Sequence, residues 1–128
     1  MTRLAQLIAR EEGFFRAGTI PAIRHNPGDL RHSPHSQHPG GPAHGNDIGT
    51  IDNDADGWAD LERQLQLDAA RGLTLQQAIF EWAPASDGND PGRYLNDVLQ
   101  GFGGAVTAQT LLHQVLLIPA IPTPPLAS

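Results

Sequence analysis

Apolar residues recur at intervals of three and four along five stretches of the chain, a spacing that predicts amphipathic helices. The first helix is predicted over residues 3–13, after a Thr2 cap and before a stop at Gly13. The later stretches end at a glycine or a proline, namely Gly72, Pro84, Gly101 and Pro119. The apolar positions are, in order, Leu4, Leu7, Ile8 and Phe15; Trp58, Leu61, Leu65 and Ala69; Leu75, Ala78, Ile79 and Trp82; Tyr94, Leu95, Val98 and Leu99; and Leu111, Leu112, Val115 and Leu116. The pattern predicts a mostly α fold of about five helices.

Capping signals mark where three of these helices begin. Thr74 and Gln77 satisfy the capping-box pattern, in which a threonine and a glutamine three residues later bond each other's backbone amides. Asp90 followed by Pro91 combines an N-cap with a proline at the first helical position. The last helix is predicted to begin at Thr107.

Between residues 18 and 53 the pattern gives way to Gly, Pro, His, Asn and Asp, and five prolines exclude a long helix there. The run Ile48–Asp52 alternates as one strand of a small β-hairpin would. So long an irregular stretch in a small domain is usually a functional loop or a disordered insertion. We therefore expect one domain over residues 1–118, and a Pro-rich tail over residues 119–128 that is a linker or an ordered strap outside the core.

Composition and charge exclude several classes of function. A chain of 128 residues can bury one core but not two. Its 8 basic residues are all arginine, and 14 carboxylates bring the net charge to -6, which argues against a nucleic acid partner. No apolar run reaches the roughly 20 residues of a membrane-spanning helix, and there is no cysteine for disulfide or thiolate chemistry. The first residues lack the apolar core of a secretory signal, so we expect synthesis in the cytoplasm and another route of delivery.

Two adjacent carboxylates, Glu11 and Glu12, close the first predicted helix and are the first candidates for chemistry. A carboxyl that is half-desolvated over a cleft has a raised pKa and stays protonated, as a general acid requires. On a helical wheel Glu11 lies in the middle of the apolar stripe and Glu12 lies roughly 80° away, at its edge. The wheel alone favours Glu11 as the buried residue; the alternative is that both are solvated charges at a fraying helix end.

Five segments together resemble one protein family. They are IAREEGFF, HNPGDLR at 25–31, GWADLERQL at 57–65, LTLQQAIFEWAPASDGND at 73–90 and RYLNDVL at 93–99. In this order they are similar to the lysozyme-like phage and bacterial proteins marked by an Asn-Pro-Gly-Asn-Leu segment. Their layout also resembles that of lytic transglycosylases and, more remotely, of goose-type lysozyme. The resemblance covers residues 4–100 and implies a single lysozyme-like domain that cleaves peptidoglycan.

The resemblance also implies roles for particular residues. It moves the choice of catalytic residue from Glu11 to Glu12, because the family's glutamate directly precedes a glycine. It implies that the Tyr94 hydroxyl orients Glu12, although Tyr94 also fits a core position of its helix. The substrate-binding residues that it implies are Asn26, Pro27, Gly28, Asp29, Leu30, Trp82 and Asn89.

Within this set, Asn26 is expected to hydrogen-bond the N-acetyl group of an aminosugar, while Pro27 and Gly28 also fit the second and third positions of a β-turn. Two positions depart from the family pattern, with His at 25 and Asp at 29 where asparagine is usual. A carboxylate at Asp29 close to Glu12 would raise the pKa of Glu12 further, and it is equally compatible with a degenerate site that has lost activity.

The remaining titratable residues suggest metals only weakly. Five of the six histidines lie between residues 25 and 44 with zinc-like spacing, but among Pro, Ser and Gly, where a catalytic zinc site would lack rigid support. Asp52, Asp54 and Asp56 mimic part of a calcium loop without its glycine and glutamate positions, so helix capping by Asp54 or Asp56 is expected instead. We expect neither a metal nor another cofactor.

The function expected is cleavage of the β-1,4 bond between N-acetylmuramic acid and N-acetylglucosamine. Asp47 and Asp52 are the only loop carboxylates available to activate water, and neither stands in a motif, so a lytic transglycosylase route to a 1,6-anhydro product is favoured over hydrolysis. The partner is then the glycan strand of peptidoglycan. A monomeric enzyme would reach it from a virion, through a holin or through a secretion machine.

Two other classes of function stay open. One is a catalytically silent virion or cell-wall binding module that keeps the cleft. The other is a metal-dependent peptidoglycan amidase or peptidase. The acidic pI of about 5.3 is unfavourable for every wall-binding function, because wall polymers are anionic.

Overall fold

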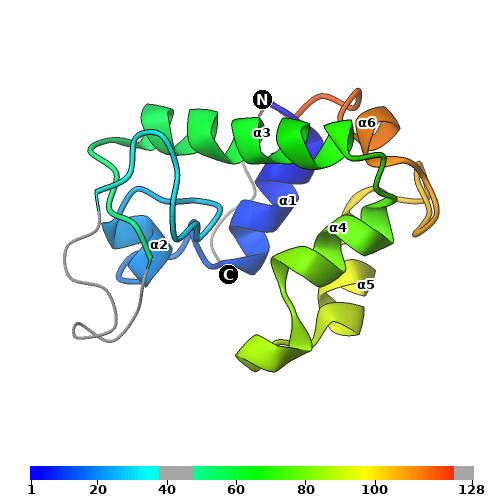
Figure 1. Ribbon diagram of the computed structural model, residues 1–128, viewed down its shortest axis with the longest axis horizontal. Coiled ribbons are helices and arrows are strands. Elements are labelled where there is room, and N and C mark those ends of the chain that lie inside the picture. The colour runs from blue at the N-terminus through cyan, green and yellow to red at the C-terminus, as the bar shows by residue number, and fades with distance from the viewer. Residues whose placement is uncertain (38–47, 123–128) are drawn as a thin grey trace.

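Helices make up most of the regular structure in the computed structural model, which describes residues 1–37 and 48–122 (Figure 1). Within these residues the chain forms α1 (Arg3–Glu11), α2 (Ile20–Ile23), α3 (Asp54–Ala70), α4 (Leu75–Trp82), the 3-10 turn η2 (Ala85–Asp87), α5 (Pro91–Gly101) and α6 (Leu112–Val115). The prediction of a mostly α fold is confirmed. None of the helices in these residues is long and apolar enough to cross a membrane.

The capping signals act as the sequence predicts. The Thr2 hydroxyl accepts a hydrogen bond from the backbone amide of Ala5, three residues into α1. Thr74 and Gln77 form the reciprocal capping box at the start of α4, with bonds of 3.2 and 2.9 Å. The Asp90 side chain accepts from the backbone amide of Arg93 and caps α5. These bonds satisfy amides that the first turn of a helix leaves without partners.

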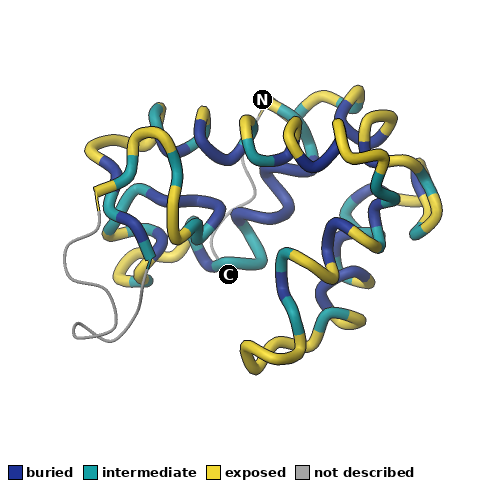
Figure 2. The backbone as a smooth tube through the Cα atoms, in the orientation of Figure 1, coloured by how far each residue is buried: buried dark blue, intermediate teal, exposed yellow. Residues whose placement is uncertain are grey.

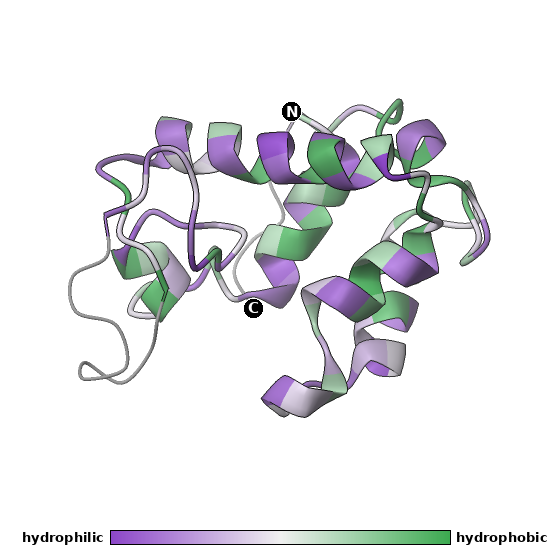
Figure 3. Cartoon of the chain, in the orientation of Figure 1, coloured by the Kyte–Doolittle hydropathy of each residue, from purple (hydrophilic) through white to green (hydrophobic). Residues whose placement is uncertain are grey.

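Helix α1 is the central helix of the core. It packs against α3 and α5, while α4 packs against α5 and α6. Helix α5 approaches so closely that a Cβ atom on Gly101 would lie 2.4 Å from Leu7 Cδ2, which only glycine avoids. Figure 2 shows α1 buried along most of its length and half-buried at its C-terminal end, where the residues are hydrophilic in Figure 3. The core thus holds α1 firmly while its last residues face outward.

The predicted helix from Thr107 is wrong for most of its length, because α6 begins only at Leu112. The carbonyl groups of Ala108 and Thr110 accept hydrogen bonds from the first backbone amides of α4, those of Gln76 and Leu75. A helix starting at Thr107 would need these carbonyl groups for its own bonds four residues on. The segment forms a turn, in which the amide of Thr110 donates to the carbonyl of Thr107, and its other carbonyl groups cap α4.

The predicted β-hairpin is also absent from the described residues, where residues 48–52 form no strand. Thr50 makes one isolated antiparallel bridge with Gln37. The neighbouring amides bond elsewhere, Gly49 to the carbonyl of Leu30 and Ile51 to that of Arg24. Because the hydrogen bonds of this run go to three separate segments, no β-ladder forms. The run instead ties the end of the loop between α2 and α3 to earlier parts of the same loop.

Two further details of that loop differ from expectation. The cap of α3 is Asn53, whose side chain accepts from the backbone amide of Asp56, rather than Asp54 or Asp56. Asp54 is the first helical residue and pairs with His25 at 2.6 Å. The short helix α2 was not predicted, although Thr19 caps it as such residues do.

The first residues of the predicted tail are bound to the start of the chain. Pro119 bridges Thr2, and the amide of Ala120 donates to the carbonyl of Met1. The buried Gln6 side chain exchanges two hydrogen bonds of 2.9 Å with the backbone of Ile121. Residues 119–121 are therefore an ordered strap, one of the two alternatives predicted for the tail. Residues 123–128 lie outside the described part of the chain.

Candidate active site

A cleft of about 560 Å³ opens where the end of α1 meets the loop after α2 and the α3–α4 pair. Six of the residues predicted for the site line it: Glu12, Gly28, Asp29, Leu30, Trp82 and Asn89. Its volume lies in the range of small-molecule sites in proteins. Segments that are far apart in the sequence thus come together as the resemblance implied.

Glu12 enters the cleft from the C-terminal end of α1. Helix α1 stops at Glu11, short of the predicted residue 13, and Glu12 is its C-cap. Gly13 follows with φ +83°, a left-handed conformation that favours glycine. Phe14 then turns back and packs edge-on against Trp58 of α3, with ring centroids 5.3 Å apart. The helix end is therefore fixed by the core on one side and by an aromatic contact on the other.

The Glu12 carboxyl is half-buried and strongly perturbed. Burial raises its pKa to about 7, and the negative charge and hydrogen bond of Asp29 add to the rise, which a hydrogen bond from Tyr94 opposes. The Tyr94 hydroxyl donates to Glu12 Oε2 at 2.7 Å. Burial and the Glu12 charge raise the pKa of Tyr94 well above its ordinary value, so the phenol stays a hydrogen-bond donor at neutral pH.

Glu11 points away from the cleft, so the helical wheel is a poor guide here. It lies in a separate surface hollow with Arg10, Asp97 and Gly101. Burial raises the pKa of Glu11 to about 7, with a further contribution from its hydrogen bond to Asp97. Glu12 still has helical backbone angles and donates its amide to the carbonyl of Ile8, so it lies at the edge of the apolar stripe, and this edge faces the cleft.

Asn26 does not face the cleft as predicted. Its side chain is 0% exposed and makes three hydrogen bonds inside its own loop. The amide nitrogen donates to the carbonyl groups of Leu30 and Gly49, and the amide oxygen accepts from the backbone amide of Leu30. No part of this side chain is left for an N-acetyl group, so Asn26 shapes the loop and does not touch a sugar in this conformation.

The segment that Asn26 holds is the predicted β-turn. The amide of Asp29 donates to the carbonyl of Asn26, with Pro27 and Gly28 at the two central positions. Gly28 lies against Trp82, where a Cβ atom would stand 3.2 Å from the indole ring. Pro27 packs on the other side, against Gly57 of α3, and is not part of the cleft lining. The turn thereby brings Asp29 and Leu30 to the cleft wall.

Asp29 lines the cleft beside Glu12. Its backbone has φ +54°, which is uncommon for a residue with a side chain. Burial raises its pKa, and the hydrogen bond with Glu12, together with Arg31 and Arg24, opposes the rise. The departure from the family pattern at this position therefore lies in direct contact with the candidate acid.

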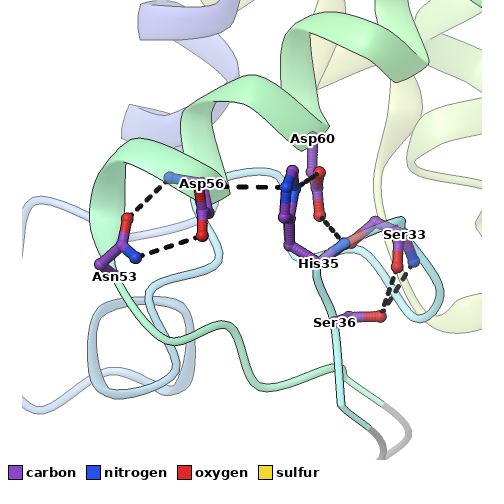
Figure 4. A network of polar contacts seen from close by, with 6 residues as sticks. All are labelled: Ser33, His35, Ser36, Asn53, Asp56 and Asp60. Atoms are coloured by element: carbon purple, nitrogen blue, oxygen red, sulfur yellow. Dashed lines mark hydrogen bonds and ion pairs between the residues drawn. The ribbon is translucent and has the colours of Figure 1, made fainter.

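The loop beyond Leu30 is anchored to α3 by a buried carboxylate (Figure 4). Asp60 is 2% exposed and accepts from both the backbone amide and the ring Nδ1 of His35, at 2.9 and 2.6 Å. The hydrogen bond to Asp60 raises the pKa of His35, which favours the charged imidazolium beside this carboxylate. This clamp fixes the segment that follows the cleft-lining residues.

Sequence reasoning missed the wall of the cleft that α3 and α4 supply. Asp68 and Gln64 line it from α3, with the Gln64 amide donating to Asp68 at 3.0 Å, and burial raises the pKa of Asp68. Arg71 lies next to them and donates two hydrogen bonds of 2.8 and 3.2 Å to the Glu81 carboxylate of α4. The signal that could have identified Asp68 is a carboxylate on the same helical stripe as Leu61 and Leu65.

The other candidates lie elsewhere. Asp52 is exposed at the surface, where it accepts from Gln37, and Asp47 lies outside the described residues. Across residues 1–37 and 48–122, no three His, Asp or Glu side chains are grouped so that they could hold a metal ion. Comparisons with protein-family models, with curated proteins and with solved structures find no match to this chain.

Proposed function

We propose that this protein cleaves the β-1,4 bond between N-acetylmuramic acid and N-acetylglucosamine in peptidoglycan, with Glu12 as the general acid. The observation that carries the proposal is the setting of Glu12, which ends α1 inside the cleft, accepts a hydrogen bond from Tyr94 and has a pKa of about 7. A carboxyl with this pKa holds its proton in many molecules at neutral pH and still gives it up readily. The resemblance to lysozyme-like proteins points to the same residue.

In the proposed reaction Glu12 donates its proton to the glycosidic oxygen as the bond from that oxygen to the anomeric carbon breaks. Tyr94 keeps the carboxyl in place and stabilises the carboxylate that remains. Glu12 then accepts a proton from the nucleophile that attacks the anomeric carbon. It returns to its starting state, so one residue serves as acid and then as base.

The nucleophile is proposed to be the 6-hydroxyl of the muramic acid itself. An inverting hydrolase places a second carboxylate about 6.5–9.5 Å from the acid, and a retaining one about 5–5.5 Å away. Asp29 lies within hydrogen-bonding reach of Glu12, closer than either of these arrangements requires. An intramolecular hydroxyl needs no such partner and is favoured by effective molarity, so the product is a 1,6-anhydro sugar.

Mass spectrometry of muropeptides released from purified sacculi tests this function. The wild-type protein should release mainly 1,6-anhydromuropeptides. Glu12→Gln keeps the shape of the side chain but cannot donate a proton, so the rate should fall about 10²- to 10⁴-fold. Glu11→Gln is the matched control, because Glu11 lies outside the cleft, and it should keep most of the activity.

Other products would identify other reactions. Muramic acid with a free reducing end, together with loss of activity in Asp68→Asn, would make the protein a hydrolase in which Asp68 activates water. Cut stem peptides would indicate an amidase or peptidase. Intact sacculi that retain the bound protein would contradict cleavage and favour the silent binding module.

A further inference from the structure

The carboxyl groups of Glu12 and Asp29 lie beside each other in the lining of the cleft, and the proposed reaction does not use the second one. Glu12 and Asp29 both line this cleft within hydrogen-bonding reach of each other, and a hydrogen bond between two carboxyl groups forms only while one of them carries a proton. Two like charges in contact do not ionise together at ordinary cost, so one proton stays with the pair. Burial raises the pKa of both carboxyl groups, and the positive charges of Arg31 and Arg24 oppose this rise at Asp29, which favours the proton on Glu12.

The backbone holds Asp29 in this contact at some cost. Its φ of +54° lies in the left-handed region, which residues with side chains seldom occupy. The fully buried Asn26 clamps the residue on both sides, because its carbonyl accepts from the amide of Asp29 and its side chain holds Leu30. Strained backbone of this kind persists where the surrounding structure imposes it, and it is concentrated at functional sites.

The charged groups around the pair come from every neighbouring segment. Tyr94 of α5 and Glu11 of α1 act on Glu12, the phenol as a hydrogen-bond donor and the carboxylate as a weak like charge. Arg31 and Arg24 act on Asp29 and favour its ionised form. The two arginines therefore act on Asp29 rather than on Glu12. This asymmetry favours the proton on Glu12 over Asp29.

We propose that Glu12 and Asp29 work as an acid pair that holds one proton, with Asp29 as a positioning residue that loads this proton onto Glu12 and later makes Glu12 a stronger base. The catalytic part of this inference rests on the proposed function, whereas the pair itself is a property of the folded protein. Before substrate binds, the Glu12 proton is shared with the Asp29 carboxylate. When a glycan binds, the proton moves from Glu12 to the glycosidic oxygen as that bond breaks.

The two carboxylates are then both ionised and in contact. Their repulsion increases the affinity of Glu12 for a proton at the moment when the muramic acid 6-hydroxyl must lose one. The hydroxyl oxygen bonds to the anomeric carbon, its proton passes to Glu12, and the pair regains the state in which it began. No proton is gained or lost over the cycle, and no further reactant is required.

Titration of Glu12 by NMR in the full chain tests the pair without any substrate. The chain has four glutamates, so side-chain carboxyl carbons labelled with 13C give few signals, and that of Glu12 is assigned by its loss in Glu12→Gln. In Asp29→Asn the Glu12 signal should titrate about one pH unit lower than in the wild type, because the neighbouring negative charge is gone. An unchanged titration of Glu12 would overturn the proposal.

Two further variants control for changes in backbone strain and for the loss of a negative charge elsewhere in the protein. Asparagine tolerates a positive φ at least as well as aspartate, and Asp29→Gly, which removes the strain together with the charge, should shift Glu12 in the same direction. Asp52→Asn is the matched control, since it makes the same change at an exposed carboxylate outside the cleft lining. The control should leave the Glu12 titration at its wild-type pH.

Activity supplies a second readout. The alkaline limb of kcat/KM on sacculi should move to lower pH in Asp29→Asn by the same amount as the NMR titration. If the wild type cleaves nothing but the NMR shift occurs, the pair stands and the proposed function fails. If the wild type cleaves and neither the titration nor the alkaline limb moves, the function stands and the pair is overturned.

Discussion

Glu12 lies between two hydrogen-bonding neighbours that act on its proton in opposite directions. Asp29 raises the pKa of Glu12, whereas the phenol of Tyr94 lowers it by donating to the carboxylate. The value of about 7 is therefore a balance to which burial makes the largest contribution. Changing either neighbour should move the pH dependence, and the two changes should move it in opposite directions.

We expect Tyr94→Phe to raise the pKa of Glu12 and to slow cleavage. The variant removes the donor that stabilises ionised Glu12, and it frees the carboxyl to rotate out of position. The alkaline limb of kcat/KM should move to higher pH, while the maximal rate falls about tenfold or more. Because Tyr94 is largely buried in the core, thermal unfolding serves as the control for the fold. A lower rate with an unmoved or acid-shifted alkaline limb would contradict this role.

At the scale of elements, the loop over residues 26–31 depends on one buried side chain. We expect Asn26→Ala to lower the free energy of unfolding by about 2–4 kcal/mol. The variant leaves two carbonyl groups and one amide without the hydrogen-bond partner that Asn26 provides. Urea denaturation measures this loss. Asn89→Ala is the matched control, since Asn89 is exposed and makes a single bond of 3.3 Å, and it should change stability by less than about 0.5 kcal/mol. Equal losses in the two variants would refute the clamp.

Elements with strong local signals were predicted from the sequence. Helices α1, α4 and α5 follow their caps and apolar spacing, because each satisfies its own first turn. The helix predicted after Thr107 was wrong, because the carbonyl groups of this segment bond to α4, more than 30 residues away in the sequence. The strand predicted for Ile48–Asp52 was wrong for the same reason, because its hydrogen bonds go to distant segments. Local pattern does not reveal which distant segment takes a backbone hydrogen bond.

The residues of the candidate site fall into the same two groups, those that local motifs identify and those whose position depends on packing. Glu12, Tyr94, Trp82 and the turn at Pro27 and Gly28 were identified because motifs carry them. The burial of the Asn26 side chain and the wall around Asp68 depend on how the loop and α3 pack, which residue types alone do not fix. Both kinds of information were needed to find the contact between Asp29 and Glu12. The motif showed an unusual residue at position 29, and the fold showed that this residue lies next to Glu12.

At the scale of the whole molecule, the cleft is made by segments from both halves of the chain. The end of α1 and the turn after α2 meet α4 and η2, which come some 60 residues later. Arg31 and Asp87 link these two sides in an exposed ion pair of 3.7 Å. Since an exposed pair of this kind contributes about 0–1 kcal/mol, the core around α1 and the clamps on α3 determine the shape of the cleft.

The pH dependence of global stability follows from the same carboxyl groups. Glu11 and Glu12 have pKa values of about 7 in the folded protein, above the ordinary 4.5, so folding favours their protonated forms. Their contribution to stability is fully present below pH 4.5 and is lost as the pH rises toward 7. The buried Asp60, whose pKa lies below its ordinary value, contributes in the opposite sense and loses its contribution as the pH falls. Stability should therefore decline between about pH 5 and pH 8.

We expect Glu12→Gln to remove part of that decline. The neutral amide can accept from Tyr94 and donate to Asp29, so it keeps the contacts of Glu12 without the cost of a buried charge. At pH 8 the variant should unfold about 3–5 °C above the wild type, which for a chain of this length corresponds to about 1 kcal/mol. At pH 4.5 the two should unfold at nearly the same temperature. Calorimetric scans across this range measure the difference, and parallel curves for the two proteins would show that Glu12 is not held in its protonated form by the fold.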